Sequence, residues 1–333
     1  SADLVLTPEL SLWGYPANDL LLKKNLIKNQ YQILDQLALD INKKYGNLSI
    51  TVGIAEIIND SFFPNLYNSI ALLERGEWKI IARKIILPTY EVFDEKRYFR
   101  SEEKVSVLTK EIHNKTWRIG FTICEDLWVN KNIEGRGIHK ENPISDLKKK
   151  KVDILVNLSA SPYTFKKLEL RSKVSSFAAQ YLQVPLIYVN QIGANDNLIF
   201  DGNSFILDKN GSKIKQLKSF SEDLSSWDIE QTKPQKNKFE KSEMSSIFDA
   251  LVLGVRDYAQ KCGFKTALIG LSGGIDSALV SAIATAALGS NNIYCVSMPS
   301  KWSSSHSKSD AKDLARRLKI NFNSIPIENL MTS

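Results

Sequence analysis

Residues 118–128, RIGFTICEDLW, form an apolar run that ends in a cysteine followed at once by two acids. The run is typical of a strand, which places Cys124 at a strand end. Carboxylates beside a thiol raise its pKa and weaken it as a nucleophile. Cys124 is therefore either a buried structural thiol or a reactive one whose helpers come from distant parts of the chain.

Outward from this stretch, residues 1–219 alternate β-rich apolar runs with helical patterns. Gly76 and Gly211 each stand between two strand-like runs and predict tight turns. The first domain is therefore expected to be α/β with mixed sheet pairing. Strands or hairpins are predicted at 3–7, 48–57, 68–87, 117–123, 153–160, 184–193 and 203–217, and helices at 19–45 and 167–183.

A second domain is expected near the C-terminus. Residues 220–241 are polar, contain one proline and lack apolar periodicity, which predicts an interdomain linker. Beyond it the pattern predicts a parallel βαβ arrangement of the nucleotide-binding kind. The elements expected there are a helix at 245–264, a strand at 265–271, a turn at 272–277, a helix at 278–289, a strand at 292–298 and a helix at 308–320.

The ends of the chain suggest a piece of a longer protein. The sequence opens inside an apparent buried strand without a methionine, and it stops after two predicted strands of the second sheet. Two strands are too few to enclose an independent core. We therefore expect a fragment that lacks both ends of the complete protein.

Composition narrows the class of protein. The 333 residues are 43% hydrophobic and 24% charged, which is ordinary for a globular protein of two domains. There is neither an apolar run of about 18 residues nor a signal peptide, so no membrane segment is expected and a cytoplasmic location is predicted. The cysteines and histidines are too scattered for a disulfide framework or a zinc site: Cys124, Cys262, Cys295, His113, His139 and His306.

The net charge of +7 raises the question of a nucleic-acid partner. The lysines are spread along the chain, apart from one compact run at residues 148–151 that precedes a strand-like segment. A solvated helix end explains that run better than a track for phosphates. A nucleic-acid partner is therefore not expected, and attraction to anionic metabolites is all that the charge predicts.

Two other charged residues lie next to or within strand-like apolar runs, where a charged side chain requires a specific reason. Glu9, in TPELSLWGYP, follows a strand and a proline, at the sheet edge where functional groups of α/β proteins collect. Lys84 lies within the apolar run of RKIILP, where an unpaired buried ammonium would cost several kcal/mol. A lysine in such a place requires a carboxylate partner.

Five ordered segments together resemble the glutaminase domain of the nitrilase superfamily: PELSLWGYP, RKIILPTYEVFDEKRYF, GFTICEDLW, VNLSASPYTFKK and VNQIGANDNLIFDGNSFILDKNG. The resemblance implies an α-β-β-α sandwich with a Glu-Lys-Cys triad. Carried across residue by residue, it makes Glu9 the general base, Lys84 the cation that stabilises the oxyanion, and Cys124 the nucleophile. It also explains the opening stretch, because Glu9 would take the thiol proton and Lys84 would offset the acids beside Cys124.

The same resemblance implies a pocket for glutamine. Tyr90, Ser161 and Lys167 would contact the substrate, while Tyr15, Phe93 and Glu125 would shape the pocket and hold the α-amino group. Glu95 matches a second carboxylate that the family carries near the triad. Ordinary core packing remains an equal explanation for Tyr15 and Phe93.

LIGLSGGIDSALVSAIATAALG places two glycines between an apolar strand and a helix, where backbone amides can bind an anion. No Gly-Lys-Ser/Thr follows, so this is not a Walker A loop. The stretch resembles the SGGxDS loop of the ATP pyrophosphatases, which implies ATP and Mg²⁺, with Asp276 as a metal ligand. The implied ATP-binding residues are Gly270, Leu271, Ser272, Gly273, Gly274, Ile275, Asp276 and Ser277.

Residues 296–311, VSMPSKWSSSHSKSDA, resemble the segment that follows the second strand in NAD synthetases. The resemblance would place Ser305, Ser307, Lys308 and Asp310 near the nucleotide. A flexible serine-rich loop explains each of these four residues equally well.

The order of the two domains resembles one family, the glutamine-dependent NAD⁺ synthetases. The resemblance implies a ligase that hydrolyses glutamine to ammonia, adenylylates deamido-NAD⁺ with ATP and releases AMP and pyrophosphate. It also implies a homo-oligomer and a sheltered path for ammonia between the sites. Because the later half of the synthetase is missing, we expect that this chain alone does not complete NAD⁺ synthesis.

Two other classes of protein remain open on the sequence. A tRNA-modifying pyrophosphatase also carries SGGxDS and would use a basic surface, although the nitrilase-type motifs have no place in that chemistry. A non-catalytic scaffold could retain both folds, although Glu9, Lys84 and Cys124 are all present.

Overall fold

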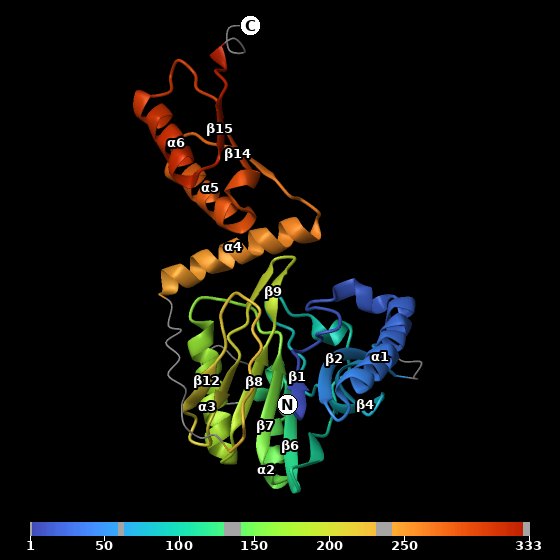
Figure 1. The fold of residues 1–333 in the computed structure, drawn as a ribbon. Helices are drawn as coiled ribbons and strands as arrows, with labels where there is room; N and C mark the ends of the chain where they lie inside the picture. Colours follow the sequence, from blue (N-terminus) through green and yellow to red (C-terminus); the bar gives the residue numbers. More distant parts are fainter. Residues whose placement is uncertain (1, 59–62, 130–140, 231–241, 329–333) are drawn as a thin grey trace. The chain divides into compact units, whose positions relative to one another are not determined.

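The computed structural model describes residues 2–58, 63–129, 141–230 and 242–328 (Figure 1). The chain divides into two compact units. The first contains residues 1–192 and 200–240, and the second contains residues 193–199 and 241–333. Each unit has its own apolar core and is described separately.

The first sheet of the first unit has four strands in sequence order. They are β1 (Leu4–Leu6), β2 (Ser49–Ile57), β3 (Leu66–Glu74) and β4 (Glu77–Arg83); β1 and β2 are parallel and the others antiparallel. The turn predicted at Gly76 is confirmed, with φ +85° at that residue. The helix predicted at 19–45 is interrupted at the extended residue Lys23, between a 3₁₀ turn (Asn18–Leu22) and α1 (Lys24–Tyr45).

The second sheet has six strands in the order β12-β11-β8-β7-β6-β5. The central strands β6 (Lys115–Ile123), β7 (Ile154–Ser159) and β8 (Leu186–Asn190) run parallel. The outer strands are antiparallel to their neighbours: β5 (Ser106–Ile112), β11 (Phe205–Leu207) and β12 (Lys213–Gln216). Strand β5 was not predicted. It lies at the sheet edge and its side chains are mostly half-exposed, so its sequence lacks the clear pattern of a buried strand.

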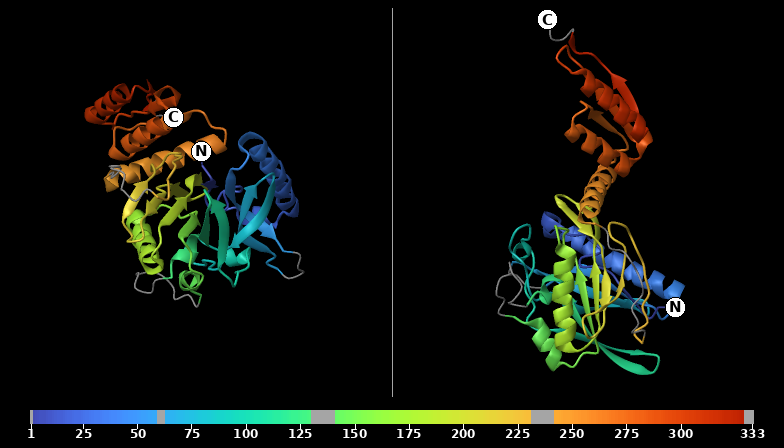
Figure 2. Two further views of the ribbon diagram at one scale, coloured as in Figure 1. Left: turned by 60° about the horizontal axis from the view of Figure 1, so that its bottom comes forward. Right: turned by 90° about the vertical axis from the view of Figure 1, so that its left-hand side faces the viewer.

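The two sheets pack face to face, with helices on both outer sides. The core between the sheets joins Ile70 and Ala82 of the first to Phe121, Val156 and Leu158 of the second. Helix α1 packs its apolar stripe on the outer face of the first sheet. Helices α2 (Pro143–Lys149) and α3 (Lys167–Leu182) cover the second sheet, as the views in Figures 1 and 2 show.

One hairpin leaves this unit. Among the strands that the structure describes, β9 (Ile192–Asn195) and β10 (Leu198–Asp201) pair only with each other, and their tip at residues 193–199 clusters with the second unit. The contacts are specific: the N–H of Ala194 donates to the Asp257 carboxylate at 2.7 Å, and Lys261 donates to the Asn195 side chain at 3.3 Å. Sequence alone assigned this hairpin to the first domain.

The second unit is a three-stranded parallel sheet with helices. Strands β13 (Ala267–Gly270), β14 (Ile293–Ser297) and β15 (Asn321–Ser324) lie in that order, so a third strand joins the two that were expected. Helices α5 (Ile275–Leu288) and α6 (Ser305–Leu318) pack on it, and α4 (Glu243–Lys261) packs on α5. Helix α6 begins three residues before the predicted start, because Ser304 accepts from the N–H of Ser307 and caps it.

Residues 220–230 of the expected linker form neither helix nor strand, and the remainder lies outside the described residues. Phe220 is buried and packs against Tyr163 of the first unit, with ring centroids 5.2 Å apart. The linker therefore begins in contact with the first unit. Its limits remain a prediction.

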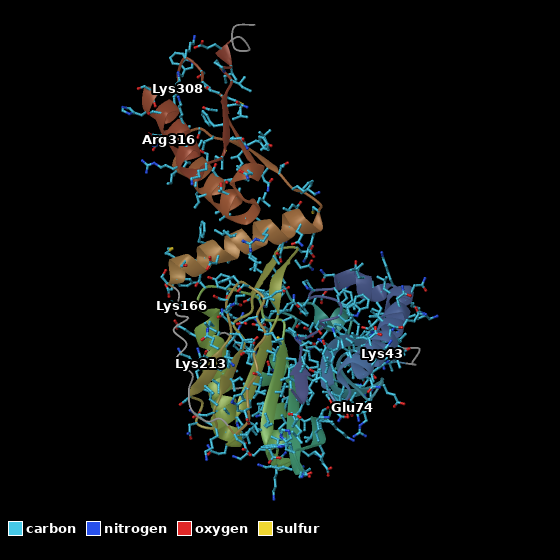
Figure 3. All side chains as sticks on the ribbon, viewed as in Figure 1. Lys43, Glu74, Lys166, Lys213, Lys308 and Arg316 are labelled. Carbon is cyan, nitrogen blue, oxygen red and sulfur yellow. The ribbon has the colours of Figure 1, made fainter. Side chains whose placement is uncertain are left out.

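The basic residues are spread over the molecule. Figure 3 shows Lys308 and Arg316 extending from α6, and Lys43 and Lys213 on different elements of the first unit. The run at residues 148–151 is a helix end, as predicted, because α2 stops at Lys149. Within the described residues, no helix is long and apolar enough to cross a membrane, and no three His, Cys, Asp or Glu side chains gather as a metal site.

A glycine on β2 lies directly under the segment that carries Glu9. A Cβ at Gly53 would lie 2.2 Å from the backbone nitrogen of Leu10 and 2.7 Å from the carbonyl oxygen of Pro8. We expect Gly53→Ala to lower the free energy of unfolding by about 3 kcal/mol, since backbone atoms cannot yield without moving the strand. Urea unfolding measures this. Gly120→Ala is the matched control: its methyl would meet only side-chain tips at 3.1 Å, and a cost as large as that of Gly53→Ala would contradict the expectation.

Candidate active site

Cys124 lies at a sharp turn after β6. The strand ends at Ile123, and a 3₁₀ turn (Cys124–Leu127) begins with φ +47° at the cysteine itself. A positive φ is uncommon for a residue with a side chain, and it persists only where the surroundings hold it. Asn157 of β7 supplies part of that hold, since its amide lies 3.4 Å from the carbonyl oxygen of Cys124.

Lys84 is completely buried and binds two carboxylates. Its Nζ lies 2.7 Å from Oε1 of Glu9 and 2.7 Å from Oε1 of Glu95. It follows the last residue of β4, and its N–H donates to the carbonyl of Asn68. The expectation that this lysine requires a carboxylate partner is confirmed, and it has two.

Glu9 is held from both sides of its carboxylate. Oε1 accepts from Lys84 and from the Asn68 amide, each at 2.7 Å, and Oε2 accepts from the N–H of Ala160 at 2.9 Å. The group is buried at 1% exposure. Three parts of the chain therefore fix this carboxylate: β3 through Asn68, the end of β4 through Lys84, and the loop after β7 through Ala160.

The thiol shares an electrostatic environment with these groups. Burial raises the pKa of Cys124 well above its ordinary value, Glu9 raises it further, and Lys84 opposes the rise. Burial alone would lower the pKa of Lys84, but Glu9 and Glu95 raise it well above the usual range. The resting site therefore holds a neutral thiol and a charged ammonium, and thiol chemistry there requires a base at the moment of attack.

Glu95 is the second carboxylate on Lys84. Its Oε1 also accepts from the Tyr15 hydroxyl at 2.9 Å, while its buried Oε2 has no hydrogen-bond partner among the described residues. Burial raises the pKa of Glu95 to about 7, although Lys84 acts against the rise. An unsatisfied buried carboxylate oxygen in a polar site is a position for a ligand or a water.

The aromatic residues expected around the substrate do gather. Tyr90 donates to Oε2 of Glu125 at 2.8 Å, which connects the residue after the thiol to the segment after Lys84. The ring of Phe93 lies 5.4 Å from that of Tyr90 and 6.2 Å from that of Tyr15. Ordinary core packing, the alternative stated for Tyr15 and Phe93, explains these aromatic contacts equally well.

Ser161 and Lys167 come from the loop after β7 and the start of α3. Ser161 is buried, and it directly follows the Ala160 N–H that binds Glu9. Lys167 places its ammonium 5.2 Å from the ring centre of Trp128, a buried residue four positions after Cys124. Both residues therefore lie on segments that border the triad.

A buried arginine that the sequence analysis missed holds this loop. Arg171 of α3 donates to both the side chain and the carbonyl of Ser161, at 3.1 and 2.7 Å. It pairs with the buried Asp201 at 2.7 Å. Arg171 stands among Glu169, Ser172 and Lys173 in the sequence, so no local signal distinguished it from a solvated helix residue.

The glycine loop of the second unit joins β13 to α5. Gly270 ends the strand, and Leu271 is a core residue, 1% exposed, whose N–H donates to Val296. Ser272 accepts from the N–H of Gly274 at 3.2 Å, and Ser277 donates to the carbonyl of Gly274 at 3.0 Å. The helix starts at Ile275, earlier than predicted, so Ile275, Asp276 and Ser277 form its first turn.

Gly273 brings the loop against α6. Its φ is +86°, and a Cβ there would lie 2.2 Å from the carbonyl oxygen of Ser307. The first turns of α5 and α6 therefore lie side by side, with Asp276 exposed on one and Ser305, Lys308 and Asp310 exposed on the other. Two adjacent helix N-termini favour an anion.

A strand-end cysteine near a doubly bound lysine and a buried carboxylate is an arrangement typical of enzymes that use a thiol nucleophile. Comparison with known families agrees: residues 1–236 match the model described as carbon-nitrogen hydrolase, and residues 247–333 match the one described as NAD synthase. The chain belongs to the carbon–nitrogen hydrolase family. The α-β-β-α sandwich followed by a parallel α/β domain is confirmed.

Relatives carry both domains in this order. The chain is 44% identical over 337 residues to the glutamine-dependent NAD(+) synthetase of Synechocystis sp., and 36% identical to that of Thermotoga maritima. All of this chain is matched, but it spans only 60% of the length of each relative. The expected resemblance to this family is confirmed.

Solved structures give the same result. The glutamine-dependent NAD+ synthetase of Acinetobacter baumannii, solved with adenosine diphosphate, matches with a TM-score of 0.86 and 35% identity, covering 99% of this chain and 59% of its own. An amidase of the nitrilase superfamily from Nesterenkonia matches 66% of this chain and 74% of its own, with a TM-score of 0.51 and 17% identity. This second likeness concerns the fold alone.

The raised pKa of Glu95 predicts a pH-dependent stability. A carboxyl whose pKa is about 7 in the folded state binds its proton more tightly there than in the unfolded chain. Its stabilising contribution is complete below the ordinary pKa near 4.5 and is lost as the pH rises through about 7. Relative to Glu95→Gln, the free energy of unfolding of the natural chain should therefore fall by about 1–3 kcal/mol between pH 4.5 and 7.5.

Urea unfolding followed by tryptophan fluorescence measures this difference, because five of the six tryptophans lie in the first unit. Glu95→Gln serves as the control for the titrating groups that do not interact with Glu95. Parallel stability curves for the two chains would show that Glu95 titrates at its ordinary pKa.

Proposed function

We propose that the first unit hydrolyses the side-chain amide of glutamine at Cys124, and that the second unit binds ATP for the amidation of deamido-NAD⁺. The observation that supports this best is the buried Lys84 held between Glu9 and Glu95 in the same electrostatic environment as the thiol. The relatives that share both domains are named as synthetases that use glutamine.

In the first step the Cys124 sulfur attacks the amide carbon. Because its thiol has a raised pKa, the proton must leave during attack, and Glu9, whose charge acts on that thiol, would accept it. The tetrahedral oxyanion is then stabilised by the fixed ammonium of Lys84, which needs no reorganisation inside the buried site. Glu9 returns the proton to the leaving nitrogen, which departs as ammonia and leaves a glutamyl thioester.

In the second step water attacks the thioester carbon. Glu9 removes one proton from that water, and the departing sulfur takes a proton back to restore the thiol, with glutamate as product. Lys84 again faces the oxyanion. The open position at Oε2 of Glu95 suits either the amide N–H of the bound substrate or the attacking water, since both donate hydrogen bonds.

Glutamine recognition would use the groups that border the triad. Glu125 offers carboxylate oxygens for the α-amino group, and Lys167 offers a cation for the α-carboxylate. Tyr90, Phe93 and Tyr15 form one side of the pocket, and Ser161 lies on the opposing loop. The roles of these six residues are part of the proposal.

In the second unit the loop at residues 270–277 would hold the phosphates of ATP. The backbone amides around Gly273 and Gly274, with the neighbouring helix N-termini, favour a polyanion. Asp276 is an exposed carboxylate in the first turn of α5, which fits Mg²⁺ because this ion is usually bound through one or two carboxylates together with substrate phosphates. When bound, the metal would supply charge neutralisation at the phosphates.

The chain spans about 60% of the length of its relatives. In a protein of the relatives' length, ammonia released at Cys124 would displace AMP from adenylylated deamido-NAD⁺. A homo-oligomer would be the natural setting for a sheltered ammonia path. The tRNA-modifying alternative is disfavoured, because the carbon–nitrogen hydrolase match covers residues 1–236.

Replacement of the nucleophile tests the first half of the proposal. Cys124→Ala should abolish glutaminase activity, measured as glutamate formed from glutamine, because the thiol is the only group proposed to bond to the substrate carbon. The circular dichroism spectrum should stay unchanged. Cys262→Ala, at an exposed thiol, is the matched control and should retain full activity. Activity in Cys124→Ala would refute the mechanism.

A glutamine-mimicking electrophile gives an independent test. It should label Cys124 once per chain, and glutamine in excess should slow the labelling, whereas asparagine should protect less. Labelling that glutamine does not slow would mean that this thiol acts on another amide.

The glycine loop tests the second half. Gly273→Ala should weaken ATP binding at least tenfold in calorimetry, because the methyl must displace the carbonyl of Ser307 and φ +86° disfavours a side chain. Gly263→Ala is the matched control: its φ is +75°, but no atom lies within 4 Å of the added methyl. Equal affinity in the two variants would place ATP elsewhere.

A further inference from the structure

The second acid after the thiol, Asp126, bonds to two separate segments of the site. Its Oδ1 accepts from the backbone N–H of Ile85 at 3.0 Å and of Ile86 at 2.7 Å, directly after Lys84. Its Oδ2 accepts from the N–H of Ile123 at 3.0 Å, directly before Cys124. The side chain is 2% exposed.

We propose that Asp126 is the positioning residue of the amide hydrolase: one carboxylate fixes the distance between the nucleophile Cys124 and the oxyanion-binding cation Lys84. This inference rests on the proposed function and adds a residue to it. Lys84 and Cys124 lie 40 positions apart in sequence, at the ends of strands from different sheets. Asp126 bonds to the residues next to both.

The chemistry of the acceptor explains why a carboxylate is needed. Three N–H donors converge on two oxygens, and only an ionised carboxylate accepts at both. Burial raises the pKa of Asp126 to about 6, while these N–H groups and Lys84 lower it, so the side chain is ionised at neutral pH. An amide of the same shape would turn an NH₂ group toward an N–H donor.

The expected consequence is a loss of rate rather than of binding. A displacement of about 1 Å in a reacting group costs on the order of 100-fold in rate. Asp126→Asn should therefore lower kcat for glutamine hydrolysis about 100-fold, with KM unchanged within about threefold, because Asp126 contacts backbone and not substrate. Alkylation of Cys124 by 2-chloroacetamide should slow at least tenfold.

The matched control is Asp153→Asn. Asp153 also accepts a backbone N–H, from Arg118 at 2.8 Å on the same strand β6, but it is exposed and far along the strand from Cys124. An asparagine there can still accept with its carbonyl oxygen, so both rates should stay within about twofold of the natural chain.

A second variant separates positioning from folding. Asp126→Ser keeps one oxygen but is too short to reach both segments, so it should lose rate as Asp126→Asn does. Both variants are to be assayed on the 333-residue chain at a temperature where circular dichroism matches that of the natural chain. Wild-type kcat and alkylation rate in either folded variant would overturn the proposal, and so would failure of both variants to fold, which would assign Asp126 to stability alone.

The alkylation measurement also separates this inference from the proposed function. If the natural chain does not hydrolyse glutamine but its Cys124 alkylates, and Asp126→Asn slows that alkylation, then the substrate is wrong and the positioning role stands. If the natural chain hydrolyses glutamine and Asp126→Asn does so equally well, the positioning role fails while the proposed function survives.

Discussion

The buried ammonium of Lys84 is the interaction on which the first unit depends. A charged amine with no exposure is tolerated only because Glu9 and Glu95 each bind it at 2.7 Å. Removal of Lys84 would leave Glu9 and Glu95 buried without their cation, and an uncompensated buried charge of this kind typically costs about 3–5 kcal/mol in stability. These ion pairs therefore hold the Lys84 ammonium in one position. In the proposed reaction, that is the cation that would face the negative charge of the oxyanion.

Hydrogen bonds from neighbouring elements hold the segments around these three charged residues. Glu9 is fixed by the N–H of Ala160, the thiol turn by Asn157, and the Ser161 loop by Arg171. These anchors join different elements: the loop after β7 to the segment after β1, strand β7 to the thiol turn, and helix α3 to the Ser161 loop. A site whose side chains come from distant segments of the chain needs such cross-links, since loops alone would leave its geometry imprecise.

The sequence predicted most of the fold and the ionic centre of the site, because both follow from strong local signals. Strand runs, the glycines at turns and a lysine in an apolar run each have a single good physical explanation. Strand β5, the break at Lys23 and the early starts of α5 and α6 depend on edge pairing and capping, which apolar periodicity does not report. The role of Asp126 was not predicted for a related reason. Its partners are backbone N–H groups, which every residue except proline carries, so the sequence does not indicate them.

The hairpin β9–β10 changes how the two halves of the chain are to be separated. Its tip at residues 193–199 clusters with residues beyond 241, and the N–H of Ala194 is satisfied by Asp257. Separating the chain at the linker would remove the acceptor of that N–H. It would also expose the side chain of Ile199, which packs so closely on Gly254 that a Cβ there would lie 3.1 Å from it. Dissection into autonomous pieces would therefore succeed only if the hairpin were shortened at the same time, since the boundary along the chain is not the boundary in space.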